Sequence, residues 1–302
     1  MPQVQNAIIM AAGCSRRFAP LSYEKPKGLW RVKGEILIER EIGQLNAAGI
    51  DDITVVVGYC KEQFYYLREK YGVELVVNED YQRYNNCSTL MRVLDRISST
   101  YICSSDNYFT ENVFESEVSR AYYAASYSSG KTGEWCLETD DKGRIKEVTV
   151  GGEGAWYMLG HAYFSPAFSA RFKEILSREY ASRKTREELW EALYARYVDK
   201  LDLYIRKYGE GKVWEFDSLE ELRTFDETYI DHSGSEIMQR IANILHCREG
   251  EIRKIRLIEQ DPKKRNFSFC CGAKRYIYLY DEERVEEQPH VYRDYGRGFM
   301  GA

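Results

Sequence analysis

An apolar segment that leads directly into a turn of small residues constrains the fold of this chain more than any other feature. Residues 7–10 have the composition of a short buried strand, and two arginines and a lysine follow soon after. The turn itself consists of Ala11, Ala12 and Gly13. Because these residues have almost no side chain, their backbone amides can face phosphate oxygens. The pattern indicates a site for a nucleoside triphosphate, but a solvated basic turn after an edge strand explains the same residues.

Arg17 and Lys27 are the candidate catalytic cations beside this turn. When the α-phosphorus of a nucleoside triphosphate is attacked, negative charge grows on its oxygens, and fixed cations lower that barrier. Two other phosphate-binding motifs are excluded, since the sequence contains no G-x-x-x-x-G-K-[ST] and the turn at Gly13 is not G-x-G-x-x-G. The sequence therefore predicts a third kind of phosphate loop.

Strand-like and helix-like segments alternate along the first third of the chain. Strands are predicted at residues 7–10, 52–57, 75–77 and 100–104, and helices at 36–49, 61–71 and 86–97. This order predicts a Rossmann-like α/β fold with a mixed, mainly parallel sheet, right-handed crossovers and helices on both faces. Ligands in such sheets bind at the carboxyl ends of the strands, where the turn at Gly13 lies.

The composition agrees with an enzyme of the cytoplasm. The chain has 302 residues, 44% of them hydrophobic, which is enough for one large α/β domain and an appendage. A net charge of −5 argues against a nucleic-acid partner. No apolar run approaches the roughly 18 residues of a membrane span, and no signal peptide is recognised, so we expect neither membrane insertion nor secretion. The eight cysteines form no C-x-x-C pair and are expected to be reduced thiols.

Residues 11–27 resemble the L-A-A-G-x-G-[ST]-R-[LFM]-x-P-L-T-x-x-x-P-K signature of the sugar-phosphate and choline-phosphate nucleotidyltransferases. Further matches narrow the resemblance to the bacterial CTP:phosphocholine cytidylyltransferases, and they lie within the segments 55–67, 84–90, 105–108, 134–135 and 215–218. The resemblance covers residues 5–230. One departure concerns the phosphate loop, because Ser15 and Arg16 stand where the family has Gly and then Ser or Thr.

The resemblance implies transfer of CMP from CTP to phosphocholine, which gives CDP-choline and pyrophosphate for the decoration of surface glycans. Arg17 and Lys27 would bind phosphate oxygens while the acceptor phosphate attacks the α-phosphorus in line. A phosphate monoester is already largely ionised near pH 7, so no general base is needed. In agreement with this, the four histidines fall in none of the matching motifs.

Asp106 and Asp217 are the predicted ligands of one Mg²⁺ ion. Asp106 follows the predicted strand 100–104, and a carboxylate beside a triphosphate is costly unless a cation is present. It would then also contact the nucleotide, although an Asx turn that closes the strand explains it equally well. Asp217 is assigned as the second ligand by the resemblance alone. A cap for the following helix, supplied by Asp217 or Ser218, is a complete alternative explanation.

The nucleobase is expected to contact Asn85, Asn86 and Ser88. Cytosine offers an amine donor and two acceptors, which amide, hydroxyl and backbone groups are sufficient to recognise. A polar N-cap for the predicted helix at 86–97 is the alternative explanation for these residues.

The acceptor pocket is assigned by the resemblance to two pairs of residues, Glu134 with Trp135 and Trp190 with Glu191. An ammonium group is attracted to the face of an indole ring, and a neighbouring carboxylate adds Coulomb attraction. The alternative is that these tryptophans belong to the core, since an aromatic residue on a helix at 187–197 is more often buried.

The pattern changes from about residue 233, so we predict a nucleotidyltransferase domain at 1–231 and a small α+β domain at 232–302. A helix is predicted at 236–245 and strands at 252–258, 266–271 and 274–280. Residues 255–280 faintly resemble the amino-terminal lobe of choline kinase-like phosphotransferases, with residues 260–264 in place of its glycine-containing loop. We interpret this region as a truncated kinase lobe that serves packing or homo-oligomerisation.

Two alternatives to phosphocholine transfer remain open. An aromatic cage also accepts a primary ammonium, so the acceptor could be 2-aminoethylphosphonate or phosphoethanolamine. A different class of function, a non-catalytic nucleotide-binding regulator, is left open by Ser15 and by the appended region. In each enzymatic case the partners are CTP and a small amine-bearing phosphate or phosphonate.

Overall fold

The computed structural model describes residues 2–258 and 264–288, and the contacts within it divide the chain into two compact units. The larger unit comprises residues 1–14 and 28–215, and the smaller unit comprises 15–27 and 216–302. These units do not follow the predicted boundary at residue 231, because the segment before it packs with the C-terminal region. The functional division of the chain at that residue stays a prediction.

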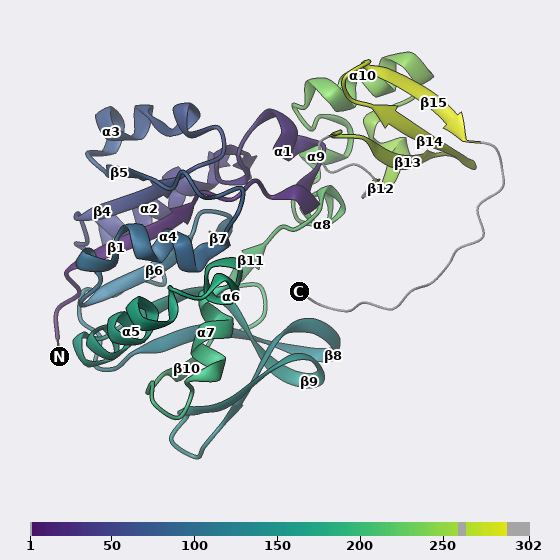
Figure 1. The fold of residues 1–302 in the computed structure, drawn as a ribbon. Coiled ribbons are helices and arrows are strands. Elements are labelled where there is room, and N and C mark those ends of the chain that lie inside the picture. The colour runs from purple at the N-terminus through teal and green to yellow at the C-terminus, as the bar shows by residue number, and fades with distance from the viewer. Residues whose placement is uncertain (1, 259–263, 289–302) are drawn as a thin grey trace. The chain divides into compact units, whose positions relative to one another are not determined.

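The larger unit contains a seven-stranded sheet with the strand order β10-β8-β9-β6-β1-β4-β5 (Figure 1). The strands are β1 (Asn6–Ala11), β4 (Ile53–Val57), β5 (Glu74–Val77), β6 (Thr100–Ser104), β8 (Tyr122–Thr139), β9 (Ile145–Phe164) and β10 (Tyr204–Lys207). β5, β4, β1 and β6 are parallel, whereas β9 runs antiparallel to both β6 and β8. The predicted mixed, mainly parallel sheet is therefore confirmed.

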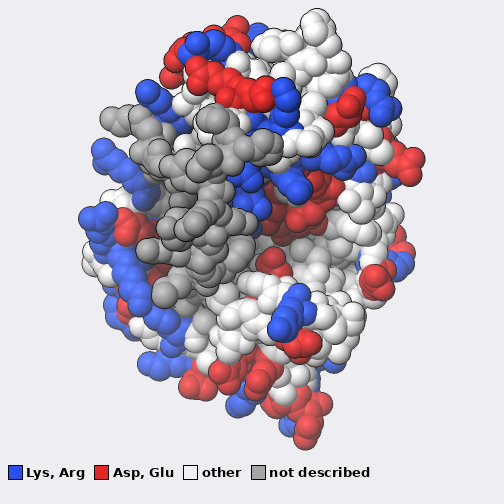
Figure 2. Space-filling view, turned by 90° about the vertical axis from the view of Figure 1, so that its right-hand side faces the viewer, with Lys and Arg blue, Asp and Glu red and all other residues white. Residues whose placement is uncertain are grey.

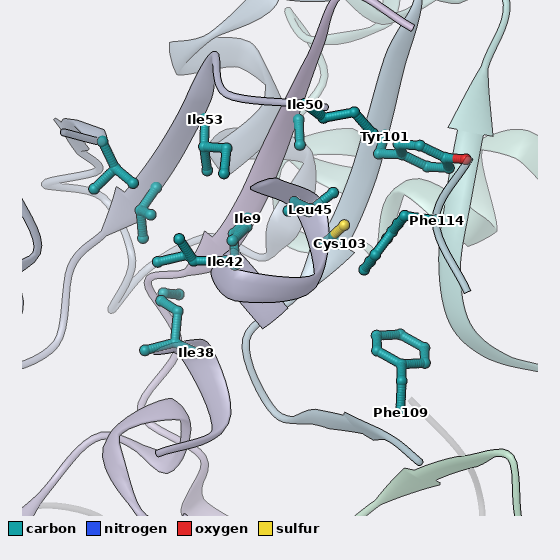
Figure 3. Close-up of a cluster of buried hydrophobic side chains, with 14 of the residues drawn as sticks. Ile9, Ile38, Ile42, Leu45, Ile50, Ile53, Tyr101, Cys103, Phe109 and Phe114 are labelled. Atoms are coloured by element: carbon teal, nitrogen blue, oxygen red, sulfur yellow. The ribbon is translucent and has the colours of Figure 1, made fainter. Parts of the chain in front are cut away.

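Helices cover both faces of this sheet. They are α2 (Leu37–Ala47), α3 (Tyr66–Tyr71), α4 (Asn86–Arg92), α5 (Pro166–Glu179), α6 (Arg183–Glu187) and α7 (Trp190–Arg196), with short 3₁₀ turns at Lys27–Leu29, Lys61–Phe64 and Leu94–Arg96. Ile9 of β1 belongs to a cluster with Ile38 and Ile42 of α2 (Figure 3). Its neighbour Ile8 belongs to a second cluster with Leu90 of α4. Since successive residues of a strand point to opposite faces, the two clusters lie on opposite sides.

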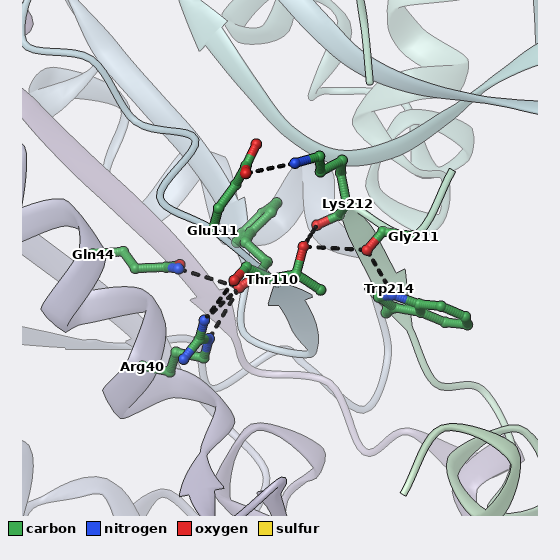
Figure 4. A network of polar contacts seen from close by, with 8 residues as sticks. Arg40, Gln44, Thr110, Glu111, Gly211, Lys212 and Trp214 are labelled. Carbon is green, nitrogen blue, oxygen red and sulfur yellow. Dashed lines mark hydrogen bonds and ion pairs between the residues drawn. The ribbon is translucent and has the colours of Figure 1, made fainter. Parts of the chain in front are cut away.

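Two short strands, β7 (Asn107–Phe109) and β11 (Val213–Glu215), pair antiparallel beside the main sheet. A network of polar contacts anchors this pair (Figure 4). Arg40 of α2 donates through Nε and Nη2 to the carbonyl oxygen of Phe109 at 3.0 and 2.9 Å. The amide of Thr110 donates to the carbonyl of Lys212 at 3.0 Å. These contacts fix the backbone directly after Asp106. A small hairpin, β2 (Arg31–Val32) and β3 (Glu35–Ile36), precedes α2.

The smaller unit is built from two stretches of chain that are far apart in sequence. Its elements are a 3₁₀ turn (Arg16–Phe18), α1 (Leu21–Glu24), α8 (Leu219–Phe225), α9 (Thr228–Asp231), α10 (Glu236–Leu245), a 3₁₀ turn (Glu249–Glu251), β12 (Ile252–Leu257), β13 (Phe267–Cys271), β14 (Lys274–Leu279) and β15 (Arg284–Gln288). The four strands form one antiparallel sheet in sequence order. The predicted helix and strands of this region are confirmed. The likeness to a kinase lobe stays a prediction, and residues 260–263 of its replaced loop lie outside the described residues.

Figure 2 shows Lys and Arg side chains interspersed with Asp and Glu over the face that it draws. Among the described helices, none is long and apolar enough to span a membrane.

Candidate active site

The turn of small residues follows β1, as the sequence predicts. Ala11 and Ala12 are buried and Gly13 is exposed. Gly58, at the end of β4, lies against this turn, because a Cβ atom there would approach the Ala12 carbonyl oxygen to 2.8 Å. The amide of Tyr59 donates to the same oxygen at 3.0 Å. The backbone of the turn is thus held by the neighbouring strand, and only glycine fits at that contact.

Ser15 adopts a left-handed backbone conformation, with φ 44° and ψ 51°. Glycine reaches this region without steric cost, whereas a residue with a Cβ atom pays about 1–2 kcal/mol. Although Ser15 replaces the glycine of the family signature, its backbone is left-handed, so the loop does not make an ordinary right-handed turn at this position.

The two predicted catalytic cations meet on one carboxylate of the smaller unit. Arg17 Nη1 lies 2.7 Å from Asp217 Oδ2, and Lys27 Nζ lies 3.2 Å from Asp217 Oδ1. Lys27 is 4% exposed and its ammonium lies over the ring of Phe18, whereas the Arg17 side chain is 76% exposed. The lysine is therefore held in place within the fold, and the arginine reaches into solvent.

Asp217 does not cap the following helix. Ser218 is the N-cap of α8, because its hydroxyl accepts from the amide of Glu221 and the Glu221 carboxylate accepts from the Ser218 amide. The same carboxylate accepts from the amide of Asp217 at 2.7 Å. The capping explanation thus applies to Ser218 and leaves the Asp217 carboxylate to the two cations.

Asp106 lies in the turn between β6 and β7. The amide of Ser105 donates to the carbonyl of Met10 at 3.2 Å, which ties this turn to β1. Gly28 packs on the same turn, because a Cβ atom there would lie 2.8 Å from Ser105. Burial raises the pKa of Glu41 well above its ordinary value, and the negative charge of Asp106 adds to the effect. The turn thus places the Asp106 carboxylate at the carboxyl end of β6, and the buried carboxylate of Glu41, from α2, lies near enough to be affected by its charge.

The residues predicted to contact the base lie at the start of α4. Asn85 is the N-cap, and its side chain accepts from the amide of Asn86 at 2.9 Å. Ser88 has no exposed surface, and its hydroxyl is already engaged, since it donates to the Asn85 carbonyl and accepts from Asn78. A base could reach the Ser88 hydroxyl only if this turn opened. Contacts of these three residues with cytosine stay predictions.

Asn86 connects this helix to the predicted acceptor residues. Its amide oxygen accepts from the backbone N–H of Trp190 at 2.6 Å, and its Nδ2 donates to Glu191 at 3.3 Å. The second oxygen of Glu191 accepts from the hydroxyl of Tyr123 at 3.0 Å. Burial raises the pKa of Glu191. No lysine or arginine of the described residues forms an ion pair with this carboxylate, so a cation arriving there would stabilise its charge.

Trp190 lies in the core and not on a surface. Its ring is 1% exposed, stacks on Tyr123 and meets the edges of Phe164 and Phe172. One face of the indole is therefore covered by Tyr123 and the ring as a whole is enclosed, so this packing leaves Trp190 no open face for an ammonium group. Trp135, on β8, is half-buried, and Glu134 beside it is exposed.

Glu215, which the sequence did not single out as a site residue, belongs to the same region of the larger unit. Burial raises the pKa of Tyr157, and the charges of Glu134 and Glu215 raise it further. The pKa of Tyr123 is also raised, chiefly by burial and then by Glu191, with Glu215 and Asp106 contributing. The negative charge of these carboxylates thus acts on both tyrosines, and it would also stabilise a cation near them. Glu215 lies two positions before Asp217 in a matching motif, which could have identified it.

His161 takes no part in this site. It is fully buried, and burial together with the charge of Arg206 lowers its pKa to about 3. The described residues contain no group of three or more His, Cys, Asp or Glu that could hold a metal alone.

Comparison with known proteins gives consistent results. Residues 7–137 match the MobA-like NTP transferase domain family. The chain is 33% identical to choline-phosphate cytidylyltransferase of Streptococcus pneumoniae over 74% of its own length and 97% of that protein. It is 38% identical to 2-aminoethylphosphonate cytidylyltransferase of Lancefieldella rimae over 74% of its own length and 93% of that protein.

One solved structure is similar in both sequence and fold. This is the CTP:phosphocholine cytidylyltransferase of Streptococcus pneumoniae, with a TM-score of 0.72 and 32% identity over 75% of this chain and 99% of that one.

Proposed function

The chain belongs to the nucleotidyltransferase family that includes the choline-phosphate and 2-aminoethylphosphonate cytidylyltransferases, and from this premise we propose that it transfers CMP from CTP to a small ammonium-bearing phosphate or phosphonate. The observation that carries the acceptor class is the buried carboxylate of Glu191, which accepts hydrogen bonds but has no cationic partner among the described residues. We further propose that the reaction takes place in the cytoplasm and that its CDP-linked product is used to decorate surface glycans.

The chain's own residues would act by binding and charge stabilisation. The acceptor oxygen attacks the α-phosphorus of CTP, and the bond to the bridging oxygen of pyrophosphate breaks as the new P–O bond forms. Lys27 and Arg17 bind phosphate oxygens on which negative charge develops, and their ion pairs with Asp217 hold both cations in a common position. The acceptor is already ionised near neutral pH, so no side chain has to remove a proton.

Asp106 and Asp217 would hold Mg²⁺. Both offer the carboxylate oxygens that Mg²⁺ prefers, and this ion commonly uses only one or two protein carboxylates together with substrate phosphates and water. This mode of binding needs no larger group of metal-ligating side chains, and the described residues contain none. When bound, the ion would supply further screening of the charge on the triphosphate.

Asp106→Ala is expected to raise the Mg²⁺ concentration for half-maximal activity at least tenfold, because it removes a direct ligand. The measurement is a Mg²⁺ titration of pyrophosphate release at saturating CTP. Asp95→Ala, at an exposed position of the same unit, is the matched control and should leave the titration unchanged. An unaltered Mg²⁺ dependence of Asp106→Ala would show that Asp106 is not a ligand.

Phosphocholine is the acceptor that the sequence resemblance favours, and one observation supports 2-aminoethylphosphonate as a second candidate. Trp190 is buried among aromatic rings, which leaves fewer indole faces for a trimethylammonium group. Carboxylates at Glu134, Glu191 and Glu215 accept hydrogen bonds, and a primary ammonium has three N–H donors to offer them. A quaternary ammonium has none.

An acceptor panel tests the proposed function. Pyrophosphate release from CTP is measured with phosphocholine, phosphoethanolamine, 2-aminoethylphosphonate and no acceptor, and kcat/KM is compared. Acceptor-dependent release with at least one compound is the expected result, and the largest kcat/KM identifies the headgroup. Binding of CTP without turnover of any acceptor would instead support the non-catalytic regulator.

Glu191→Gln is expected to raise the acceptor KM about thirtyfold at pH 8, because it removes the charge that faces the ammonium group. A carboxylate loses its charge as the pH falls through its pKa, and burial has raised the pKa of Glu191. As the pH is lowered, the acceptor KM of the wild type should therefore begin to rise at a higher pH than it would if the group were an exposed glutamate. This rise should be absent in Glu191→Gln. Tyr123 and Cys87 face the same group, but both have raised pKa values and stay neutral in this range.

The ratio of the two acceptor KM values, measured from pH 5 to 8, cancels the titration of the acceptor's own phosphate, which both enzymes experience equally. Glu187→Gln, an exposed position on α6, is the matched control. A ratio that does not change with pH would exclude Glu191 as the group that binds the ammonium.

A further inference from the structure

We infer that the C-terminal region is a positioning element for the catalytic segment: α10 and the four-stranded sheet fix residues 15–27 through Glu24 and Tyr23. This segment carries Arg17 and Lys27, so the inference rests on the proposed function of these two cations. It concerns contacts inside the smaller unit alone. The region would thus act on CTP binding by the same polypeptide.

Glu24 binds the N-terminus of α10. Its Oε1 atom accepts from the hydroxyl of Ser235 at 2.7 Å and from the amide of Ile237 at 2.8 Å, and its Oε2 atom accepts from the amide of Glu236 at 3.1 Å. The first amides of a helix have no partner inside the helix and carry partial positive charge, so a carboxylate is a favourable ligand there. Ser235 is at the same time the N-cap, because its hydroxyl accepts from the amide of Met238. Glu24 therefore completes the cap of a helix that follows it by more than two hundred residues.

The side chain of Tyr23, next to Glu24 in sequence, packs against aromatic residues of the C-terminal region. Its ring lies 5.4 Å from that of Tyr280 in an edge-on arrangement and 6.4 Å from that of Phe267, which is fully buried. The guanidinium of Arg265 lies over both tyrosine rings, at 5.7 Å from Tyr23 and 5.2 Å from Tyr280. Ring contacts and cation–π contacts of this kind contribute about 0.5–1.5 kcal/mol each.

The segment has only short-range contacts of its own to keep this shape. α1 is a single turn of four residues, and isolated helices shorter than about 12 residues are marginal in water. The segment is instead fixed near both of its cations by residues from beyond position 216, since Asp217 binds Arg17 and Lys27. Glu24 lies between these cations in sequence, so a loss of its contacts with α10 would loosen Lys27 in particular.

Glu24→Gln and Tyr23→Leu test the inference. Each is expected to raise the KM for CTP about tenfold while the acceptor KM stays within a factor of two, because only the triphosphate segment is loosened. A general loss of structure would change both constants together. Glu283→Gln is the matched control, since Glu283 forms an exposed ion pair with Arg240 in the same unit. Ser235→Ala, which removes one of the three contacts to Glu24, should give a smaller effect in the same direction.

A second measurement asks whether the effect passes through Lys27. In a Lys27→Met background, Glu24→Gln should change the KM for CTP by less than a factor of two. An undiminished tenfold effect there, or an unchanged KM in Glu24→Gln alone, would overturn the inference. Calorimetric CTP affinity of the wild type and of Glu24→Gln separates this result from a failure of the proposed function, because it requires no turnover. If no acceptor reacts, the inference still stands or falls with the difference between these two affinities.

Discussion

Replacement of Lys27 by methionine is expected to lower kcat/KM for CTP by about 10² to 10³, because a fixed cation beside the developing phosphate charge is lost. Lys27 is 4% exposed and held by Asp217 at 3.2 Å, so its ammonium is in place before substrate arrives. Methionine preserves most of the side-chain volume and leaves Arg17 to neutralise Asp217. The effect should therefore be on catalysis, with little change in the free energy of unfolding.

Steady-state pyrophosphate release measures this loss, and denaturant unfolding checks the fold. Lys25→Met is the control within the same segment, since Lys25 is only half-buried. Arg17→Met should have a smaller effect than Lys27→Met, because the Arg17 side chain is 76% exposed and solvent screens its charge. A change in kcat/KM of less than threefold for Lys27→Met would show that Lys27 does not take part in catalysis.

Replacement of Arg223 by methionine is expected to lower the free energy of unfolding by about 3–5 kcal/mol, because it breaks a buried hydrogen-bond network. The guanidinium donates to the carbonyl oxygens of Tyr229 at 3.0 Å, Ile252 at 2.8 Å and Glu249 at 2.7 Å. Burial lowers the pKa of Arg223. Three segments of the chain meet on this one side chain, and its removal takes one hydrogen-bond donor from each of their carbonyl groups.

Urea unfolding followed by circular dichroism gives the change for Arg223→Met. Arg253→Met, at an exposed position of β12, is the control and should stay within about 0.5 kcal/mol of the wild type. If Arg223→Met also stayed within 1 kcal/mol, water would have to reach the three carbonyl groups in the variant.

The parallel part of the fold could be predicted because its hydrophobic pattern is local. The strands β1, β4 and β6 are mainly apolar and almost entirely buried runs between helices with one apolar face, and all were expected. The strands β8 and β9 were not expected, although they run for 18 and 20 residues. Their middle portions are exposed and rich in Gly, Ser and Thr, and several register shifts interrupt the pairing. The length of each strand is therefore set by its pairing with the other strand and not by a hydrophobic pattern within its own sequence.

The candidate site could be predicted in part, for the same reason. Arg17, Lys27 and Asp217 were named from short motifs, and the structure brings them together. Trp190 and Ser88 were also named, yet both are buried, because a motif shows which residues are present and not which side of a helix they occupy. Glu191, the next residue, is also buried, but its carboxylate accepts hydrogen bonds from Tyr123 and Asn86, whereas the Trp190 ring packs on aromatic rings. Only the packing of α7 separates these two roles.

The division of the smaller unit between two distant stretches of chain has a consequence for biosynthesis. Lys27 and Asp217 are 190 positions apart, and Glu24 and Ser235 are 211 positions apart. At about 5–20 residues per second, a ribosome needs roughly 10–40 s to make the intervening chain. During that interval β1 can pair with β4 and β6, whereas the segment that carries Lys27 has left the ribosome without the residues that hold it. If Lys27 acts as proposed, activity should appear late in translation, and a ribosome that stalls before residue 217 would release a chain with most of its central sheet and no anchored Lys27.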